Sequence, residues 1–142
     1  MPDKDYIIIV QCDLVMQRCS GYYCEQALHE RTGGFAQYPA DKAYRTICMT
    51  CGGCCGLPSH RKLSHLLRKL KSKEKKDKQN VVVHLSTCIT KDNFHGPPCP
   101  HMETWRIHKI YPLTRQAYSV ICPNIAYSYY QPSCATDCEN YR

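Results

Sequence analysis

Near its start the chain reads Tyr6-Ile7-Ile8-Ile9-Val10-Gln11. β-Branched residues fill the middle of this segment, so a strand built from it would be apolar on both faces. Such a run is typical of a strand that is buried on both sides in a parallel sheet. We therefore expect residues 6–11 to form a buried strand.

Strand-like and helix-like segments alternate along the rest of the chain. Apolar runs rich in β-branched residues predict further strands at residues 45–50, 81–85 and 118–122. Amphipathic patterns and their end signals predict helices at residues 22–31, from Pro58 to Leu70, and at 100–110. The alternation predicts an α/β fold, a small Rossmann-like three-layer sandwich around a mostly parallel four-stranded sheet.

The chain has 142 residues, enough for one domain with its own core. We assign residues 1–123 to this domain, with a basic surface segment at 69–80, and residues 124–142 to an irregular extension rich in Cys and Tyr. The apolar run at 7–10 is too short for a signal peptide, and no segment approaches the length of a membrane span. We therefore expect a cytoplasmic protein without membrane contact, whose 12 cysteines are reduced thiols or metal ligands.

The formal net charge of +7 comes from one segment. Residues 61–78 contain nine Lys or Arg and two acidic residues, which gives a local charge of +7, and the rest of the chain is neutral. We interpret this segment as the solvated end of a helix followed by a connection. Nucleic acid is therefore not an expected partner.

Cysteines gather where the predicted strands end. Those at or just after a strand end are Cys12, Cys51, Cys54 and Cys88, and the following loops add Cys19, Cys24, Cys99 and His101. In a parallel sheet these ends lie at one edge, where open α/β folds bind their ligands. The pattern therefore predicts a site rich in thiols at that edge. Cys48, inside the second strand, is better interpreted as a small buried apolar residue.

The motif Cys51-Gly52-Gly53-Cys54 joins the second strand to the following helix. Two thiols at this spacing suit either a soft metal ion or disulfide exchange. Glycine permits backbone conformations with positive φ that a side chain would disfavour. The positive end of the next helix would face this loop, and we expect it to lower the pKa of these thiols.

Three segments together resemble the CGGC domain family of bacteria and archaea: Cys51-Gly52-Gly53-Cys54, Ser86-Thr87-Cys88-Ile89-Thr90-Lys91 and Pro98-Cys99-Pro100-His101. The resemblance implies a metal-binding domain. Mixed cysteine and histidine ligands favour zinc, with an iron–sulfur cluster as the alternative. The ligands that it implies are Cys51, Cys54, Cys88, Cys99 and His101, with Cys12, Cys19 and Cys24 as further candidates.

Two enzymatic alternatives stay open. Cys51 and Cys54 could form a thioredoxin-like pair and make the protein a thiol–disulfide oxidoreductase. More remotely, Cys12 and Arg18 have the C-x5-R spacing of low-molecular-weight phosphatases, although residues 14–16 are bulky and lack the small residues that let amides cradle phosphate. The sequence does not decide between an enzyme and a structural or sensing protein.

Overall fold

The computed structural model describes residues 4–53, 57–91, 99–102 and 119–120. Its three longer strands form a parallel sheet: β1 (Tyr6–Gln11), β2 (Arg45–Thr50) and β3 (Val81–Leu85). β1 lies between the other two, and Ile8 pairs with Ile47 on one side and Val83 on the other. All residues of β1 are buried, as expected for a central strand with both faces covered. These three predicted strands are confirmed with their predicted bounds.

A two-residue strand, β4 (Ser119–Val120), pairs parallel to β3 and gives the order β2-β1-β3-β4. The rest of the predicted strand at 118–122 lies outside the described residues, as do residues 103–110 of the predicted third helix and the extension at 124–142. The structure confirms a mixed α/β fold with three parallel strands. A full four-stranded, Rossmann-like sheet stays a prediction.

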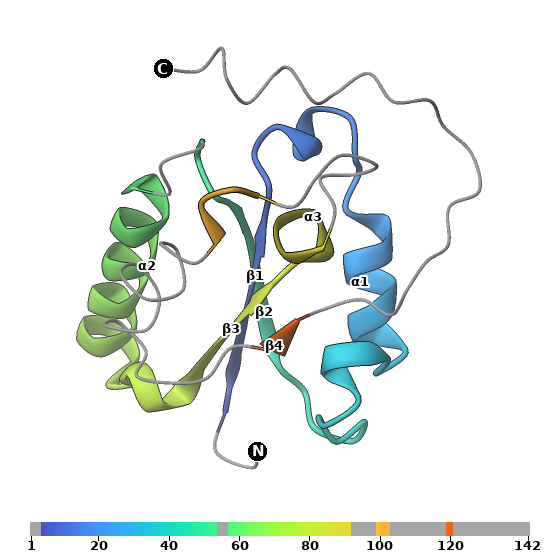
Figure 1. The fold of residues 1–142 in the computed structure, drawn as a ribbon. Helices are drawn as coiled ribbons and strands as arrows, with labels where there is room; N and C mark the ends of the chain where they lie inside the picture. Colours follow the sequence, from blue (N-terminus) through green and yellow to red (C-terminus); the bar gives the residue numbers. More distant parts are fainter. Residues whose placement is uncertain (1–3, 54–56, 92–98, 103–118, 121–142) are drawn as a thin grey trace.

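Helices cover both faces of the sheet, as Figure 1 shows. One face carries α1 (Tyr22–His29) and the short 3₁₀ helix η2 (Gly33–Phe35), and the other carries α2 (Leu57–Lys69). The α1-side core consists of Ile7, Ile9, Ala27, Phe35, Tyr38 and Val82. The α2-side core consists of Tyr6, Ile8, Val10, Cys12, Val15, Cys51, Leu63, Leu70, Val81, Val83, Leu85 and Ile89. Alternate residues of β1 and β3 therefore supply different cores.

The helix α2 forms where the sequence predicts it. Pro58 stands in its first turn, where the missing N–H removes no helical hydrogen bond. Leu63 is buried in the α2-side core. The helix continues as a π-helical turn, η3 (Leu70–Glu74), and ends at Lys75, whose φ of 55° is left-handed. The lysines of η3 are exposed, whereas Lys76, farther along the basic segment, is partly buried and forms an ion pair with Asp5 at 2.6 Å. Within the described residues, no helix has the length and apolar character needed to cross a membrane.

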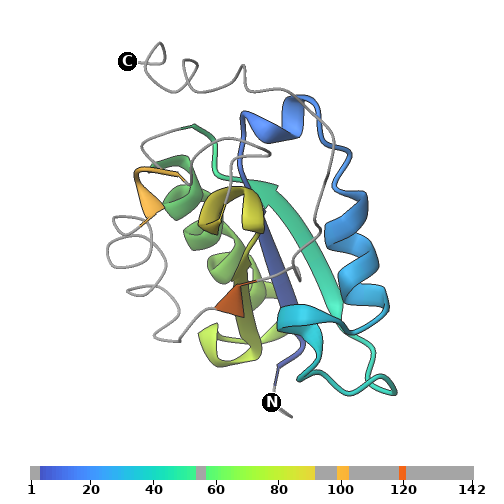
Figure 2. The same ribbon diagram turned by 45° about the vertical axis from the view of Figure 1, so that its right-hand side comes forward.

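The three parallel strands run toward one edge of the sheet, which we call the carboxyl edge (Figure 2). There β1 leads into the 3₁₀ helix η1 (Val15–Gln17), and β3 leads into α3 (Thr87–Thr90). Cys88 was expected at the end of the third strand, but β3 ends at Leu85 and Cys88 lies inside α3. The helix α3 has only four residues, too few to show a helical period in the sequence.

Cys48 corrects a second expectation, because its side chain is exposed rather than buried. It lies on β2, which pairs only with β1 among the described strands. The α1-side core contains side chains from β1 and β3 and, among the described residues, none from β2. The described residues therefore leave one face of β2 partly uncovered.

Candidate functional site

The turn after β1 positions the first site residue, Cys12. This residue is buried and directly follows the last residue of β1. The Met16 N–H donates to the Cys12 carbonyl at 3.0 Å, and this bond turns the chain back toward the sheet. Val15 is buried in the α2-side core and fixes the turn there. The turn is therefore held by its own carbonyl contacts and by packing.

Cys51 follows β2 and begins the Cys-Gly-Gly-Cys motif. Gly52 has a φ of +74° and Gly53 a φ of +108°, both in the region that favours glycine. A Cβ atom on Gly52 would also lie 2.5 Å from the Pro58 Cβ, whereas one on Gly53 would meet no described residue within 4 Å. The Ser59 hydroxyl donates to the Cys51 carbonyl at 2.6 Å and ties α2 to the motif. Glycine is thus needed at position 52 for close packing as well as for the backbone conformation.

Three sulfur atoms lie at the carboxyl edge, and the amides of one turn donate to them. The Cys12 N–H donates to the Cys88 sulfur at 3.2 Å, and the Asp13 N–H donates to the Cys51 sulfur at 3.2 Å. The next two amides in the chain hydrogen-bond to the Cys12 sulfur. Successive N–H groups from residues 12–15 are therefore all directed at sulfur. Runs of backbone N–H groups of this kind form concave sites that favour negative charge.

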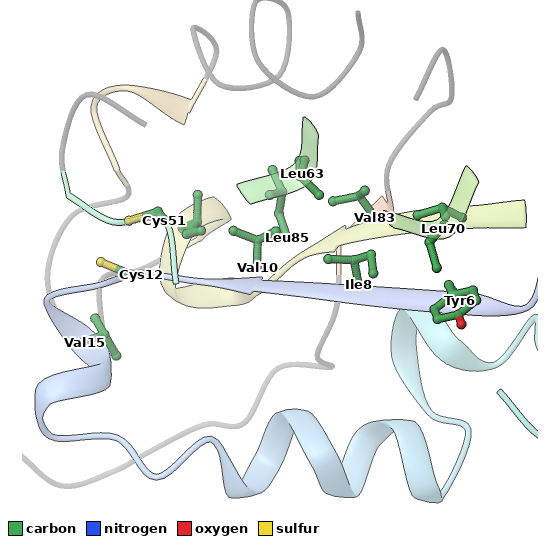
Figure 3. Close-up of a cluster of buried hydrophobic side chains, with 12 residues drawn as sticks. Tyr6, Ile8, Val10, Cys12, Val15, Cys51, Leu63, Leu70, Val83 and Leu85 are labelled. Carbon is green, nitrogen blue, oxygen red and sulfur yellow. The ribbon is translucent and has the colours of Figure 1, made fainter. Parts of the chain in front are cut away.

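Cys12 and Cys51 also contact each other. Figure 3 shows them side by side at one end of the α2-side core, with their sulfur atoms on facing sides. The hydrogen bond from Cys51 is the main cause that lowers the pKa of Cys12, and the amides of residues 14 and 15 add to it against the opposing effect of burial. The same contact, followed by burial, raises the pKa of Cys51. Burial raises the pKa of Cys88 to about 12. Within this cluster Cys12 is therefore the favoured thiolate and Cys51 its proton donor.

The prediction that the N-terminal end of α2 lowers the pKa of Cys51 is wrong. The prediction considered only the helix dipole. In the fold, Cys51 is buried beside a second thiol that takes the negative charge, and these two effects outweigh the amides of Asp13 and Gly53 that act on the Cys51 sulfur. The second thiol, Cys12, is far from Cys51 in the sequence, so the residues around the motif do not reveal that the two are in contact.

Two other predicted ligands, Cys19 and Cys24, lie close enough to Cys88 that their charges act to raise its pKa. Cys19 and Cys99 pack against the α2-side core. Cys24 packs against the α1-side core, with its sulfur 3.5 Å from the Ser86 hydroxyl. His101 is exposed.

The structure thus brings together Cys12, Cys51 and Cys88 of the predicted ligands. Cys54 lies outside the described residues. Among the side chains that are described, no three histidine, cysteine, aspartate or glutamate residues form a group that could hold a metal ion. The sulfur atoms have instead the hydrogen-bonded arrangement of free thiols, with Cys51 donating to Cys12.

The structure bears differently on the two enzymatic alternatives. The pair of Cys51 and Cys54 stays a prediction, because one member is not described. For the phosphatase-like alternative, the amides of residues 16–19 donate to carbonyls of the same turn. These amides are therefore not directed at a bound anion, as a phosphate-binding loop requires. The amides of residues 13–15 in the same loop are directed at sulfur.

Two contributors to the site were missed in the sequence. Asp13 acts through its backbone N–H, a role that no side-chain pattern reveals. Ser59 acts through its hydroxyl, and a serine in the first turn of a predicted helix was an available signal for a contact with nearby backbone.

A family model described as CGGC domain matches residues 6–121. The match covers most of the chain, so the chain belongs to the CGGC domain family, and the resemblance seen in its cysteine segments is confirmed. No curated protein and no solved structure matches the chain.

Proposed function

We propose that this member of the CGGC domain family binds a soft metal ion through thiolates at the carboxyl edge of its sheet. Cys12, Cys51 and Cys88 are the central ligands of the proposed site. Zinc is the favoured ion and an iron–sulfur cluster the alternative, since cysteine thiolates bind both. The observation that carries the proposal is the run of amides at residues 12–15, which donate to these sulfur atoms.

The chemistry of the donor set fits a soft metal ion. Thiolate is the form of cysteine that binds metal, and amide hydrogen bonds to sulfur stabilise its negative charge. The run of amides supplies such bonds to all three sulfur atoms before any ion is present. Loading would replace the proton between Cys12 and Cys51 and would turn the sulfur atoms toward a common point. The raised pKa values of Cys51 and Cys88 imply that the ion competes with protons, so its affinity should increase with pH.

Three sulfur atoms leave a tetrahedral ion one ligand short. Cys54, which completes the motif, is the first candidate for the fourth position, followed by Cys99 and His101. Cys19 and Cys24 are further candidates, because the charges of both act on Cys88. When bound, the ion would join the ends of three chain segments and would act as a Lewis acid if one position stayed open. Reduced thiols require a reducing compartment, which favours the cytoplasm.

The direct test is the metal content of protein that is produced in metal-replete medium and purified without oxygen. We expect about one zinc ion per chain by elemental analysis. Visible absorption together with iron would replace zinc by an iron–sulfur cluster. Protein that contains no metal and takes up none on titration would refute the proposal.

Serine variants locate the site. Cys12→Ser, Cys51→Ser and Cys88→Ser should each weaken zinc affinity by about tenfold or more, measured by competition with a chromophoric chelator. Cys48→Ser is the matched control, because Cys48 lies on the strand that leads to Cys51 but is exposed. Equal losses in Cys48→Ser and in the three site variants would show that the zinc is held elsewhere.

A further inference from the structure

We infer that Cys12 and Cys51 form a reversible disulfide that joins the ends of β1 and β2 when the protein reacts with a small disulfide. The first support is strand register. The last pair of the β1–β2 ladder is Gln11 with Thr50, so Cys12 and Cys51 are the next two residues opposite each other. The Cys51 N–H still donates to the Gln11 carbonyl at 2.8 Å, so the strands have not separated there.

This register gives a separation that a disulfide can span. Neighbouring strands lie about 4.7–4.9 Å apart. Disulfides join residues whose Cα atoms are about 4.4–6.8 Å apart. Both residues have left the regular ladder, so their backbones can adjust to the shorter distance that the Cβ atoms need. No large movement of either strand is required.

The two side chains also point the same way. Val10 lies two residues before Cys12, and both belong to the α2-side core, as the alternation along a strand requires. Met49, two residues before Cys51, packs against the same core. The thiols are in hydrogen-bonding contact, and Figure 3 shows their sulfur atoms on facing sides. By contrast, the described contact between Cys12 and Cys88 joins a backbone N–H to a sulfur rather than two sulfur atoms.

The reaction is an exchange with a small disulfide, written RSSR. The Cys12 thiolate attacks one sulfur of RSSR, which forms a mixed disulfide and releases one thiolate RS⁻. Cys51 passes its proton to that leaving thiolate and then attacks the Cys12 sulfur, which releases the second RS⁻ as the internal disulfide forms. The protein loses two electrons and RSSR gains them, so that two RSH are produced after one further proton is taken from water. Exposed fractions of 7 % for Cys12 and 8 % for Cys51 restrict the reaction to small reagents.

This disulfide would also control the metal site. A sulfur in a disulfide is no longer a thiolate ligand. Oxidation would therefore remove two of the three central ligands and release the ion. This second part rests on the proposed function, whereas formation of the disulfide does not.

The test uses the full chain after treatment with a chelator and a reductant that are then removed. The protein is incubated with oxidised glutathione, remaining thiols are blocked with N-ethylmaleimide, and linked peptides are identified by mass spectrometry. We expect a peptide pair joined through Cys12 and Cys51 in the wild type and in the control Cys48→Ser. The pair should be lost in Cys12→Ser and Cys51→Ser. A wild-type protein in which Cys51 is joined to Cys54, or Cys12 to Cys88, would overturn the inference without any need for a folded variant.

A second measurement separates the two proposals. Zinc-loaded protein is oxidised in the presence of a chromophoric chelator, and release of zinc together with the Cys12–Cys51 link supports both parts. The link without any metal uptake by the reduced protein would refute the metal site and leave the disulfide standing. Metal uptake by the reduced protein, with no such link after chelation and oxidation, would refute the disulfide and leave the metal site standing.

Discussion

The two faces of the sheet bury their polar groups in different ways. On the α1 side, His84 lies inside β3 with none of its surface exposed. Its Nε2 atom is 2.7 Å from the Tyr38 hydroxyl, and its ring centroid lies 4.7 Å from that of Phe35. Burial lowers the pKa of His84 to about 4, so the imidazole is neutral near pH 7.

On the α2 side, the corresponding polar groups are sulfur atoms beyond the ends of the strands. Backbone amides of an irregular turn satisfy them, instead of a single side chain within the sheet. A side-chain pair in the middle of a sheet is fixed in one protonation state by its surroundings. Sulfur atoms at the sheet edge keep reactive lone pairs, because amide hydrogen bonds occupy them only in part. The surroundings of His84 therefore suit a structural role, whereas the sulfur atoms at the carboxyl edge keep lone pairs for the metal binding or disulfide exchange that we propose.

On the α2 side, we expect the largest loss of stability from a substitution in the turn at Gly52. We expect Gly52→Ala to lower the free energy of unfolding by about 2–5 kcal/mol, from the strained backbone and from overlap with Pro58. Gly53→Ala is the control: Gly53 also has a positive φ, but an added Cβ would meet no described residue within 4 Å, so its loss should be about 1–3 kcal/mol. Urea unfolding of the reduced, metal-free protein measures both. Equal losses would show that close packing against α2 does not hold this turn.

The α1 side should be sensitive to acid through His84. The unfolded chain binds a proton near pH 6.5, whereas the folded chain binds it only near pH 4. Because the unfolded state then holds more protons, stability decreases as pH falls through this window, by up to about 3 kcal/mol. His84→Gln should be less stable at pH 7 and should lack this part of the pH dependence. A pH profile that is the same in both proteins would show that His84 titrates normally and is not sealed in the core.

A substitution at Tyr38 tests the hydrogen bond between its hydroxyl and His84. Tyr38→Phe leaves a buried imidazole nitrogen without the tyrosine hydroxyl, and we expect a loss of about 1–3 kcal/mol at pH 7. Tyr44→Phe is matched in chemistry, but the Tyr44 hydroxyl is buried and has no hydrogen-bond partner among the described residues. Its removal should therefore leave stability unchanged or increase it, because a buried hydroxyl without a partner is destabilising. Thermal unfolding of the two variants side by side provides the measurement, and a larger loss for Tyr44→Phe would reverse our interpretation of this face.

The same contrast shows what the sequence can predict. The strands at 6–11, 45–50 and 81–85 were found because apolar runs follow from burial on both faces. The helix ending near Leu70 was found because its leucines recur at helical spacing. Cys12, Cys51 and Cys88 were assigned to one edge because the carboxyl ends of parallel strands lie together.

The details of the site were beyond the sequence for three physical reasons. Pairing between parallel strands is non-local, so no nearby residue reveals that Cys12 lies opposite Cys51. The amides that bind sulfur are backbone groups, which every residue carries. The pKa of Cys51 depends on its neighbour across the ladder, so a prediction from the adjacent helix had the wrong sign.

We expect the smallest effect on the thiol site from substitutions of the exposed lysines just beyond the end of α2. Lys71 and Lys73 are exposed and lie past the last residue of α2. The 13 residues of this helix span roughly 20 Å, more than twice the Debye length of ~8 Å at physiological salt. Exchange of both lysines for serine should therefore leave zinc affinity unchanged within error, because screening isolates the thiols from these charges. The same variants test nucleic acid as a partner: wild-type protein should show little binding to oligonucleotides at physiological salt. Tight binding with a steep salt dependence that the exchanges flatten would show instead that this surface has a function of its own.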